Sequence, residues 1–371
     1  MTKIIMIASL LFVNIYANQL TQEQILGKTL FFDKNLSQNR TQACATCHNP
    51  DSGFIDDRDN GVAKMASMGD NGTSIGDRSA PTASYAKFSP LFHYDKKEKA
   101  YVGGQFWDGR ASTLEDQAGG PPLNPDEMGM MGKKEVVNRL LENLYYVSSF
   151  KKLYGNEIFN NPEKAFEALT KSIASFERSD EVSPFDSKYD RFLRDEYDLT
   201  ALEDLGKALF FSNNNNSCSS CHVLKGEDKE GETFTNYQYH NIGTPVNKDL
   251  RTKNGAKRLD DGLLANPAVT DKTQRGKYKV PTLRNVAVTG PYMHNGVFSD
   301  LKTVVEFYDK YNNTQRSINP ETGKKWAEPE IEDTISKEEL KAKKLTDRKV
   351  EALVAFMKLL TDKKYEHLIK E

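Results

Sequence analysis

The sequence predicts a mostly α-helical chain that is built from two similar halves. A heptapeptide of the form Leu-Gly-Lys-x-Leu-Phe-Phe occupies residues 26–32 and again residues 205–211, and a Cys-x-x-Cys-His pattern follows each copy. Both copies have apolar residues at helical spacing, and no stretch shows the sustained alternation of a long strand. Two unrelated amphipathic helices would share the spacing but not the heptapeptide. We therefore interpret the chain as a duplicated unit, with one domain over residues 18–185 and a second over residues 186–371.

The predicted helices follow from apolar spacing and from cap residues. Thr21 and Thr200 stand just before the two heptapeptide helices, where a hydroxyl can accept a hydrogen bond from the first turn. Apolar periodicity predicts further helices over residues 134–154, 162–178 and 346–360. The polar stretch from Ser179 to Asp198 is the candidate linker between the domains, and the Lys/Glu-rich residues 319–345 are expected to form a solvated surface excursion.

Length, charge and the first residues narrow the classes of function. The 371 residues allow two domains with cores of their own, and the formal net charge of −2 comes from interspersed basic and acidic residues, so no nucleic-acid partner is expected. Residues 1–17 have the basic start, apolar run and small final residue of a signal peptide. We therefore expect export to the periplasm and no stable membrane insertion afterwards. An uncleaved anchor is the alternative.

The cysteines indicate covalently bound haem. All four lie in the patterns Cys44-Ala-Thr-Cys47-His48 and Cys218-Ser-Ser-Cys221-His222. This spacing places two thiols at the two vinyl groups of a haem and brings the next His to the iron. A four-Cys zinc site would not need the two His residues, and a redox-active dithiol would sit in a βαβ context that the sequence does not show. We expect two haem c groups, one in each half.

Several segments then resemble one family. The run from Phe106 to Gln117, the runs at 120–121 and 124–129, and the segments 239–243, 280–286 and 289–296 are similar to the bacterial di-haem cytochrome c peroxidases, a family that includes the MauG enzymes. The resemblance spans nearly the whole chain after residue 17. It implies two cytochrome c-like domains wrapped on their haems and peroxide chemistry at the N-terminal haem.

The same resemblance implies roles for four residues between the haem motifs. Gln117, Pro121 and Glu127 match the distal pocket of the peroxide site, where a carboxylate can accept a proton from one peroxide oxygen and return it to the other. Trp107 matches a Trp that relays electrons between the haems. Without the resemblance, Glu127 would be interpreted as a surface carboxylate and Trp107 as a packing residue.

A calcium site is also implied. Thr289 and Pro291 match positions whose backbone carbonyls bind calcium between the domains in the family. The family's Asn ligand is replaced here by Ser79.

One departure from the peroxidases concerns the N-terminal haem. Typical peroxidases have a distal His on the loop that corresponds to residues 73–82, and here that loop has none. His93 is the other candidate in this half, but a solvated or structural His is the preferred interpretation. We therefore expect an iron that is open to peroxide without prior reduction.

A second departure concerns the C-terminal haem. The peroxidases place a Met ligand fourteen residues after the His that corresponds to His294, and this count reaches Tyr308. Leu301, Val304 and Val305 share a helix face with Tyr308, so a buried core Tyr is the alternative. MauG-type enzymes carry a Tyr ligand at this position, and we expect Tyr308 to bind iron. A phenolate favours ferric iron and lowers the potential.

These observations predict a peroxide-dependent di-haem oxidoreductase. Its partners would be hydrogen peroxide and either a small cytochrome c-type donor, giving cytochrome c peroxidase activity, or a protein substrate that is oxidised as by MauG. A non-catalytic electron carrier is the alternative of another class, but a carrier has no use for the Gln117, Pro121 and Glu127 set.

Overall fold

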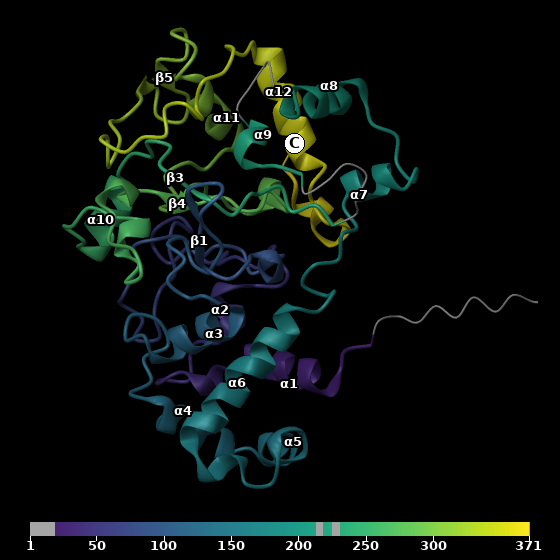
Figure 1. Cartoon of the computed structure of the whole chain (residues 1–371), viewed down its shortest axis with the longest axis vertical. Helices are drawn as coiled ribbons and strands as arrows, with labels where there is room; N and C mark the ends of the chain where they lie inside the picture. The colour runs from purple at the N-terminus through teal and green to yellow at the C-terminus, as the bar shows by residue number, and fades with distance from the viewer. Residues whose placement is uncertain (1–18, 213–217, 225–230, 371) are drawn as a thin grey trace, which may run out of the picture.

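The structure is a computed structural model that describes residues 19–370 apart from 213–217 and 225–230. The predicted signal peptide, residues 1–17, lies outside the described residues. The described part is mostly helical and contains three short two-stranded antiparallel sheets. None of its helices is both long and apolar enough to cross a bilayer. The helices before residue 180 form one end of the molecule, and α8, α11 and α12 lie at the other end (Figure 1).

The regular elements are short. The helices of the first half are α1 (Gln22–Phe31), α2 (Cys44–Cys47), α3 (Leu114–Leu123), α4 (Lys133–Leu141), α5 (Leu144–Tyr154) and α6 (Pro162–Glu177). Those of the second half are α7 (Lys188–Leu193), α8 (Ala201–Phe210), α9 (Cys218–Cys221), α10 (Lys248–Asn254), α11 (Leu301–Asp309) and α12 (Asp347–Lys358). Hairpins pair β1 (His93–Asp95) with β2 (Ala100–Val102) and β5 (Ile318–Asn319) with β6 (Lys324–Lys325). The third antiparallel pair joins β3 (Tyr239–His240) to β4 (Tyr278–Lys279), which are distant in the sequence.

The duplicated heptapeptide forms the same helix crossing twice. Helix α1 packs on α6, and α8 packs on α12. The predicted caps are confirmed, because Thr21 and Thr200 each form a capping box at the start of α1 and α8. The glycine of each heptapeptide lies at the crossing: a Cβ on Gly27 would lie 1.8 Å from the Ser172 carbonyl oxygen, and one on Gly206 would lie 1.9 Å from that of Ala352. Only glycine allows the two helices of each pair to approach so closely.

Each helix pair has a hydrophobic core of its own. One buried cluster draws its residues from positions 26–182 and includes Leu30, Phe31 and Phe176. The other draws from positions 189–360 and includes Phe210 and Phe356. The heptapeptide therefore supplies Leu and Phe side chains to the centre of both cores.

Three expectations about local structure need correction. The predicted helix 134–154 is broken into α4 and α5, because the Asn143 side chain caps a new helix at Leu144. The candidate linker Ser179–Asp198 contains α7, with Tyr189 and Asp190 buried. Residues 319–345 are not a simple solvated excursion: Ile331, Leu340 and Leu345 in this segment are buried. The prediction was based on the Lys/Glu-rich composition of the segment and gave too little weight to the few apolar residues that pack it against the second half.

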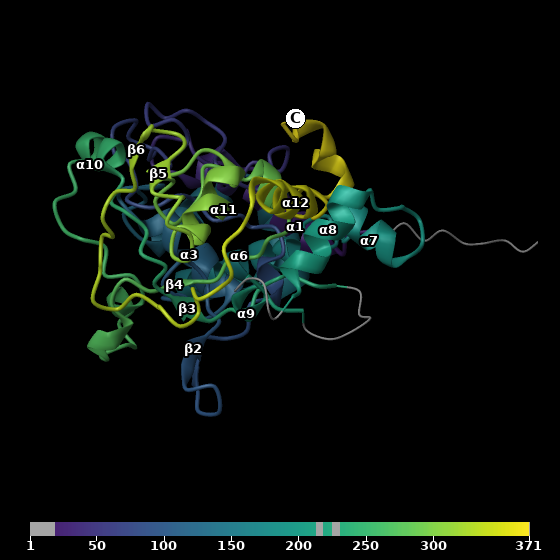
Figure 2. The same cartoon turned by 90° about the horizontal axis from the view of Figure 1, so that it is seen from above.

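The β1–β2 hairpin projects from the body of the molecule (Figure 2). His93 pairs with Val102 in this hairpin, and the side chain of His93 is exposed. Its ring Nδ1 lies 2.8 Å from the Leu91 carbonyl oxygen. This location agrees with the interpretation of His93 as a solvated residue.

Candidate functional site

The first Cys-x-x-Cys-His motif forms one helical turn that ends on its histidine. Helix α2 spans Cys44–Cys47, and His48 follows as its C-cap. The Nδ1 atom of His48 lies 3.2 Å from the Phe54 carbonyl oxygen. Burial lowers the pKa of His48 below its ordinary value. A neutral ring that donates its Nδ1–H to a carbonyl presents Nε2 as a free ligand, which is the usual arrangement for a metal-binding histidine.

The second motif repeats this geometry. Helix α9 spans Cys218–Cys221, and the Nδ1 atom of His222 lies 2.8 Å from the Phe234 carbonyl oxygen. Burial lowers the pKa of His222 to about 4. The two accepting residues also match, because Phe54 and Phe234 both have positive φ angles, of 58° and 53°. Non-glycine residues pay a steric cost in this region, so its recurrence in both halves indicates a shared local requirement.

No disulfide joins any two of the four cysteines. Burial raises the pKa of Cys47 and Cys221 to about 11 and that of Cys218 to about 12. Within the described ranges, no group of three or more His, Cys, Asp or Glu side chains is placed to hold a metal ion. The four cysteines are therefore not gathered into one four-Cys cluster in that part of the chain.

The second half contains a large apolar cavity next to its motif. The cavity and the open solvent at its mouth together contain about 1480 Å³ of space free of protein atoms, and the lining includes Cys218, Cys221, His222, Tyr308 and Trp107. The lining also includes His240 and His294, whose Nε2 atoms are buried and have no hydrogen-bond partner. A buried polar atom without a partner is costly unless another group satisfies it. Two thiols, the His222 ring, apolar walls and two buried imidazole nitrogens without partners fit a haem with its carboxylate side chains.

Residues 319–345 close one side of this cavity. Ser336, Glu339, Leu340, Ala342 and Lys343 all line it. The Asn241 side chain fastens the segment by donating to the Ile331 carbonyl at 2.9 Å and to the Thr334 hydroxyl at 2.9 Å. The cavity wall therefore includes residues that the sequence alone assigned to the solvent.

Tyr308 enters the cavity from α11. Burial raises the pKa of Tyr308 well above its ordinary value, and the nearby Cys221 and Cys218 thiols act in the same direction. The side chain therefore shares its surroundings with both anchoring thiols. A phenol in an apolar cavity stays protonated unless a cation lies beside it, and a bound metal ion supplies such a cation. The position suits a second ligand to an iron held by His222.

Trp107 connects the two halves. Its indole Nε1–H donates to the Ser79 carbonyl oxygen at 2.9 Å, and its own carbonyl accepts from the Lys279 backbone N–H at 2.9 Å. Ser79 belongs to the first half and Lys279 to the second, where the indole also lines the cavity. The indole is therefore bonded to the first half and the Trp107 backbone to the second.

The predicted distal residues of the first half lie on α3 and on the turn after it. Gln117 and Pro121 are on α3, and the Pro121 carbonyl accepts from the backbone N–H groups of Asn124 and Met128, at 3.2 Å each. The Asn124 carbonyl then accepts from the Glu127 N–H at 3.1 Å. This turn folds Glu127 back towards the helix. Burial raises the pKa of Glu127, and the positive charge of Arg110 opposes the rise.

Arg110 is a component that sequence reasoning did not single out. Its guanidinium carbon lies 3.6 Å from the centre of the Phe106 ring, and its Nη1 donates to Asp108 at 3.0 Å. Phe106 also lies against α3, because a Cβ on Gly120 would be 3.7 Å from its ring. Arg110 therefore supplies a fixed cation whose field reaches Glu127. Its position within the motif 106–117 was the available signal.

Comparisons with known proteins agree with this geometry. A family model described as "Di-haem cytochrome c peroxidase" matches residues 21–198. The chain is 49% identical to methylamine utilization protein MauG of Paracoccus denitrificans, over 93% of this chain and 90% of that protein. The chain belongs to the di-haem cytochrome c peroxidase family.

Other relatives of this family member support the assignment. It is 31% identical to cytochrome c peroxidase Ccp of Escherichia coli, over 85% of this chain and 57% of that longer protein. The crystal structure of the diheme peroxidase BthA from Burkholderia thailandensis aligns with a TM-score of 0.82 at 29% identity, over 95% of this chain and 89% of that one. The resemblance noted from the motifs is thus confirmed, and membership of this family implies two haem c groups.

The calcium site of the family stays a prediction for this member. The Ser79 hydroxyl donates to the carbonyl oxygens of Met293 and His294, at 3.1 and 3.2 Å, and the Ser79 backbone N–H also donates to His294, at 2.8 Å. These contacts hold Ser79 against residues 293–294. Calcium takes six to eight oxygen ligands, and the bonds of Ser79 do not join it to Thr289 or Pro291.

Residues 73–82, the loop that corresponds to the one with a distal histidine in typical peroxidases, contain an arginine that forms ion pairs. Arg78 donates to both carboxylate oxygens of Asp260 at 2.6 Å and to Asp108 at 2.8 Å. Asp260 lies in the second half, and the contact lowers its pKa to about 2 although burial acts in the opposite direction. Residues 73–82 therefore include an ion-pair anchor between the halves.

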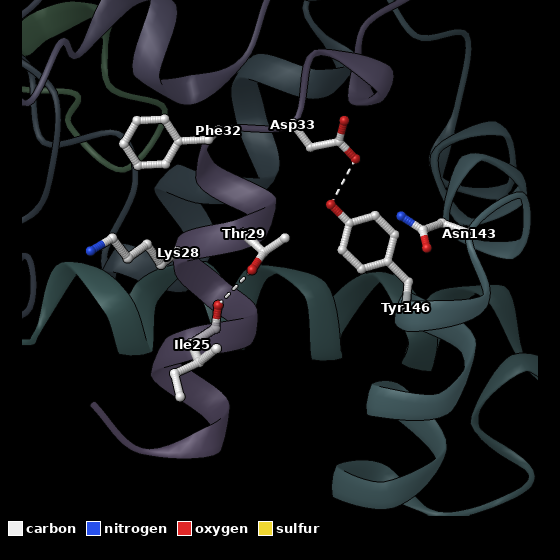
Figure 3. A pocket seen from close by; sticks show the side chains of 7 residues that line it. All are labelled: Ile25, Lys28, Thr29, Phe32, Asp33, Asn143 and Tyr146. Carbon is white, nitrogen blue, oxygen red and sulfur yellow. Dashed lines mark hydrogen bonds between the residues drawn. The ribbon is translucent and has the colours of Figure 1, made fainter. Parts of the chain in front are cut away.

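A second hollow lies on the surface between α1 and α5 (Figure 3). Its lining residues include Ile25, Lys28 and Phe32, and the Tyr146 hydroxyl donates to Asp33 at 2.8 Å beside it. Neither Cys nor His lines this hollow, so we assign no chemistry to it.

Proposed function

We propose that this chain is an exported di-haem oxidoreductase of the MauG type, which uses hydrogen peroxide at its N-terminal haem. The observation that carries the proposal is the location of Tyr308 in the same cavity as His222 and both anchoring thiols. A Tyr at this place distinguishes the MauG enzymes from peroxidases that have a Met ligand. The proposed domains are residues 18–185 and 186–371, and the proposed location is the periplasm, on the basis of the signal peptide that the sequence predicts at residues 1–17.

The chain itself would hold the two haems. Cys44 and Cys47 would attach one through thioether bonds and Cys218 and Cys221 the other, with the Nε2 atoms of His48 and His222 facing the irons. When bound, each haem supplies redox-active iron. The carbonyls of Phe54 and Phe234 set the ring orientation and tautomer of the two histidines.

Glu127 would move the proton that cleavage of peroxide requires. Its carboxylate accepts a proton from one oxygen of the peroxide and returns it to the other, which then leaves as water. Arg110 counteracts the burial of Glu127 and so maintains part of its ionised population. Gln117 would orient the peroxide, and Pro121 would exclude water from the neighbouring space.

Trp107 would carry electrons between the halves. Its ring lines the cavity of the second half while its Nε1–H is bonded to the first half. A phenolate at Tyr308 lowers the potential of the second iron, so this half accepts electrons poorly from an ordinary high-potential cytochrome c. It is better suited to share oxidising equivalents, as oxidation of a protein substrate needs.

Cytochrome c peroxidase activity is the second candidate. The family contains both kinds of enzyme, and Ccp of E. coli is 31% identical to this chain. The greater similarity to MauG, at 49% identity, favours the first candidate. A non-catalytic electron carrier is the third candidate, and a half-buried Glu127 within the electrostatic field of Arg110 argues against it.

The decisive experiment is a potentiometric titration of the haem-loaded protein and of the Tyr308→Met variant. Replacing a phenolate with a thioether should raise the midpoint potential of one haem and leave the other nearly unchanged. An unchanged pair of potentials would show that Tyr308 is not a ligand. Peroxide consumption is then measured with and without reduced cytochrome c. Oxidising equivalents that persist without the cytochrome support MauG-type activity, fast cytochrome oxidation supports a peroxidase, and no consumption with any donor supports a carrier.

A further inference from the structure

Asp362 is a buried carboxylate that joins the two halves of the molecule. It follows α12, and none of its surface is exposed. Its Oδ1 accepts a hydrogen bond from the Tyr85 hydroxyl at 2.6 Å, and its Oδ2 accepts one from the Asn285 side-chain amide at 2.8 Å. Its backbone N–H donates to the Asn285 Oδ1 at 2.8 Å. Tyr85 belongs to the first half and Asn285 to the second.

Tyr85 and Asn285 occupy equivalent positions in the duplication. Each stands four residues after the proline of a Pro-Thr pair, at 81–82 and 281–282. Each has a φ of 62° and precedes a short 3-10 turn. The threonines match as well: the Thr82 hydroxyl donates to the Gly53 carbonyl at 2.6 Å, and the Thr282 hydroxyl to the Thr233 carbonyl at 2.7 Å. A single carboxylate therefore binds the same point of both repeated loops.

In the first half, this loop leads directly to the haem-binding histidine. Two residues before Tyr85, the Ala83 backbone N–H donates to the Phe54 carbonyl at 3.2 Å. The same carbonyl oxygen lies 3.2 Å from Nδ1 of His48. The hydroxyl bond at Tyr85 therefore fixes the loop that helps to hold the acceptor of His48.

In the second half, contacts of Arg284 surround Phe234, whose carbonyl is the equivalent acceptor. Arg284, next to Asn285, donates from Nε to the Glu232 carbonyl at 2.6 Å. Its guanidinium carbon lies 5.3 Å from the centre of the Phe234 ring and 5.5 Å from that of Tyr85. The Phe234 carbonyl is the acceptor of His222. One side chain, Arg284, thus contacts the loop of the first half and the acceptor residue of the second.

We propose that Asp362 is a positioning residue shared by both haem-binding histidines. By fastening Tyr85 with one oxygen and Asn285 with the other, it couples the orientation of His48 to that of His222. The hydrogen bond on Nδ1 governs the basicity and direction of a ligand histidine, so a change at one loop reaches both irons. This role needs only the two attached haems, and it goes beyond the choice between peroxidase and MauG-type activity.

The test compares two conservative variants of the haem-loaded protein, Tyr85→Phe and Tyr146→Phe. Each removes one phenol hydroxyl that donates to a carboxylate, Asp362 in the first case and Asp33 in the second. NMR of protein labelled with ¹⁵N-histidine follows the exchange of the Nδ1–H of His48 and His222 with deuterated solvent. Tyr85→Phe should accelerate exchange at both histidines by about tenfold, since an acceptor left without its partner destabilises the closed loops. Tyr146→Phe should accelerate neither.

The same coupling should appear from the other side. Asn285→Gly keeps the positive φ available and removes the amide, and it should accelerate exchange at His48 as well as at His222. Midpoint potentials of both haems should shift in Tyr85→Phe and stay unchanged in Tyr146→Phe. If each variant changes only the histidine of its own half, or if Tyr146→Phe changes both to the same extent, Asp362 is a structural tie alone and the proposal is overturned.

Discussion

Gly206→Ala tests whether the duplicated helix crossing depends on glycine. Helix propensity alone favours the variant, because Ala in a helix interior is about 1 kcal/mol better than Gly. The crossing opposes it, because the new Cβ would lie 1.9 Å from the Ala352 carbonyl oxygen and 2.9 Å from the Phe356 Cβ. Ordinary contact begins near 3.4 Å, so α8 and α12 would have to separate by about 1.5 Å.

Such a separation loosens the packing between Phe210 and Phe356, whose ring centres are 5.0 Å apart. Overpacking of this kind costs about 1–3 kcal/mol, and a rigid backbone oxygen places the cost at the upper end. After the gain in propensity, we expect a net loss of about 2 kcal/mol in the free energy of unfolding, measured by urea denaturation of the haem-loaded protein.

Ala208→Gly is the matched control on the same helix. Ala208 is exposed, so this variant should lose only the roughly 1 kcal/mol of helix propensity. A Gly206→Ala protein that is as stable as the unmodified protein, or more stable, would refute the reasoning, because the propensity term would then act without the clash.

Three further outcomes are expected. Glu127→Gln should reduce peroxide turnover about 10²- to 10⁴-fold. Because burial raises the pKa of Glu127, turnover of the unmodified protein should fall as the pH drops through that raised pKa. The kcat/KM profile of the variant should lack this fall at low pH. Asp190→Asn should cost about 3–5 kcal/mol in urea denaturation, since it leaves the fully buried Arg284 without its ion partner. Burial raises the pKa of Glu177 from 4.5 to about 8. The proton on the folded protein's Glu177 therefore contributes fully to the free energy of unfolding below pH 4.5, and this contribution is lost as the pH rises through 8. The stability of Glu177→Gln relative to the unmodified protein should therefore rise over this range, by at most about 5 kcal/mol.

Features with a local cause were predictable from the sequence. Thr21 and Thr200 form the expected caps because a threonine hydroxyl satisfies an N–H of the first turn wherever a helix begins. The helices over 162–178 and 346–360 were also correct to within a few residues, since their apolar spacing is continuous. The Cys-x-x-Cys-His motifs required no knowledge of the fold, because their spacing matches the cofactor itself.

Features that depend on distant contacts were not predictable. Composition could not show that residues 319–345 cover the cavity of the second half, because the Asn241 bonds that hold them come from a distant segment. The field of Arg110 on Glu127 depends on the turn after α3, and the roles of His240 and His294 depend on the cavity that they line. Asp362 gave no signal, because its two partners are 277 and 77 residues away.

The duplication also indicates where the two haem sites diverge. The helix crossing, the cap, the turn with its histidine and the carbonyl acceptor recur in both halves with the same geometry. Helices α3 and α11 each follow the repeated loop of their half, with Pro-Thr at 81–82 or 281–282, and pack on the last helix of that half, α6 or α12. Equivalent helices therefore carry different groups: α3 brings Gln117 and Pro121, whereas α11 brings Tyr308. We infer that the turn with its histidine was kept in both halves because it would hold a haem, and that function diverged through α3 and α11.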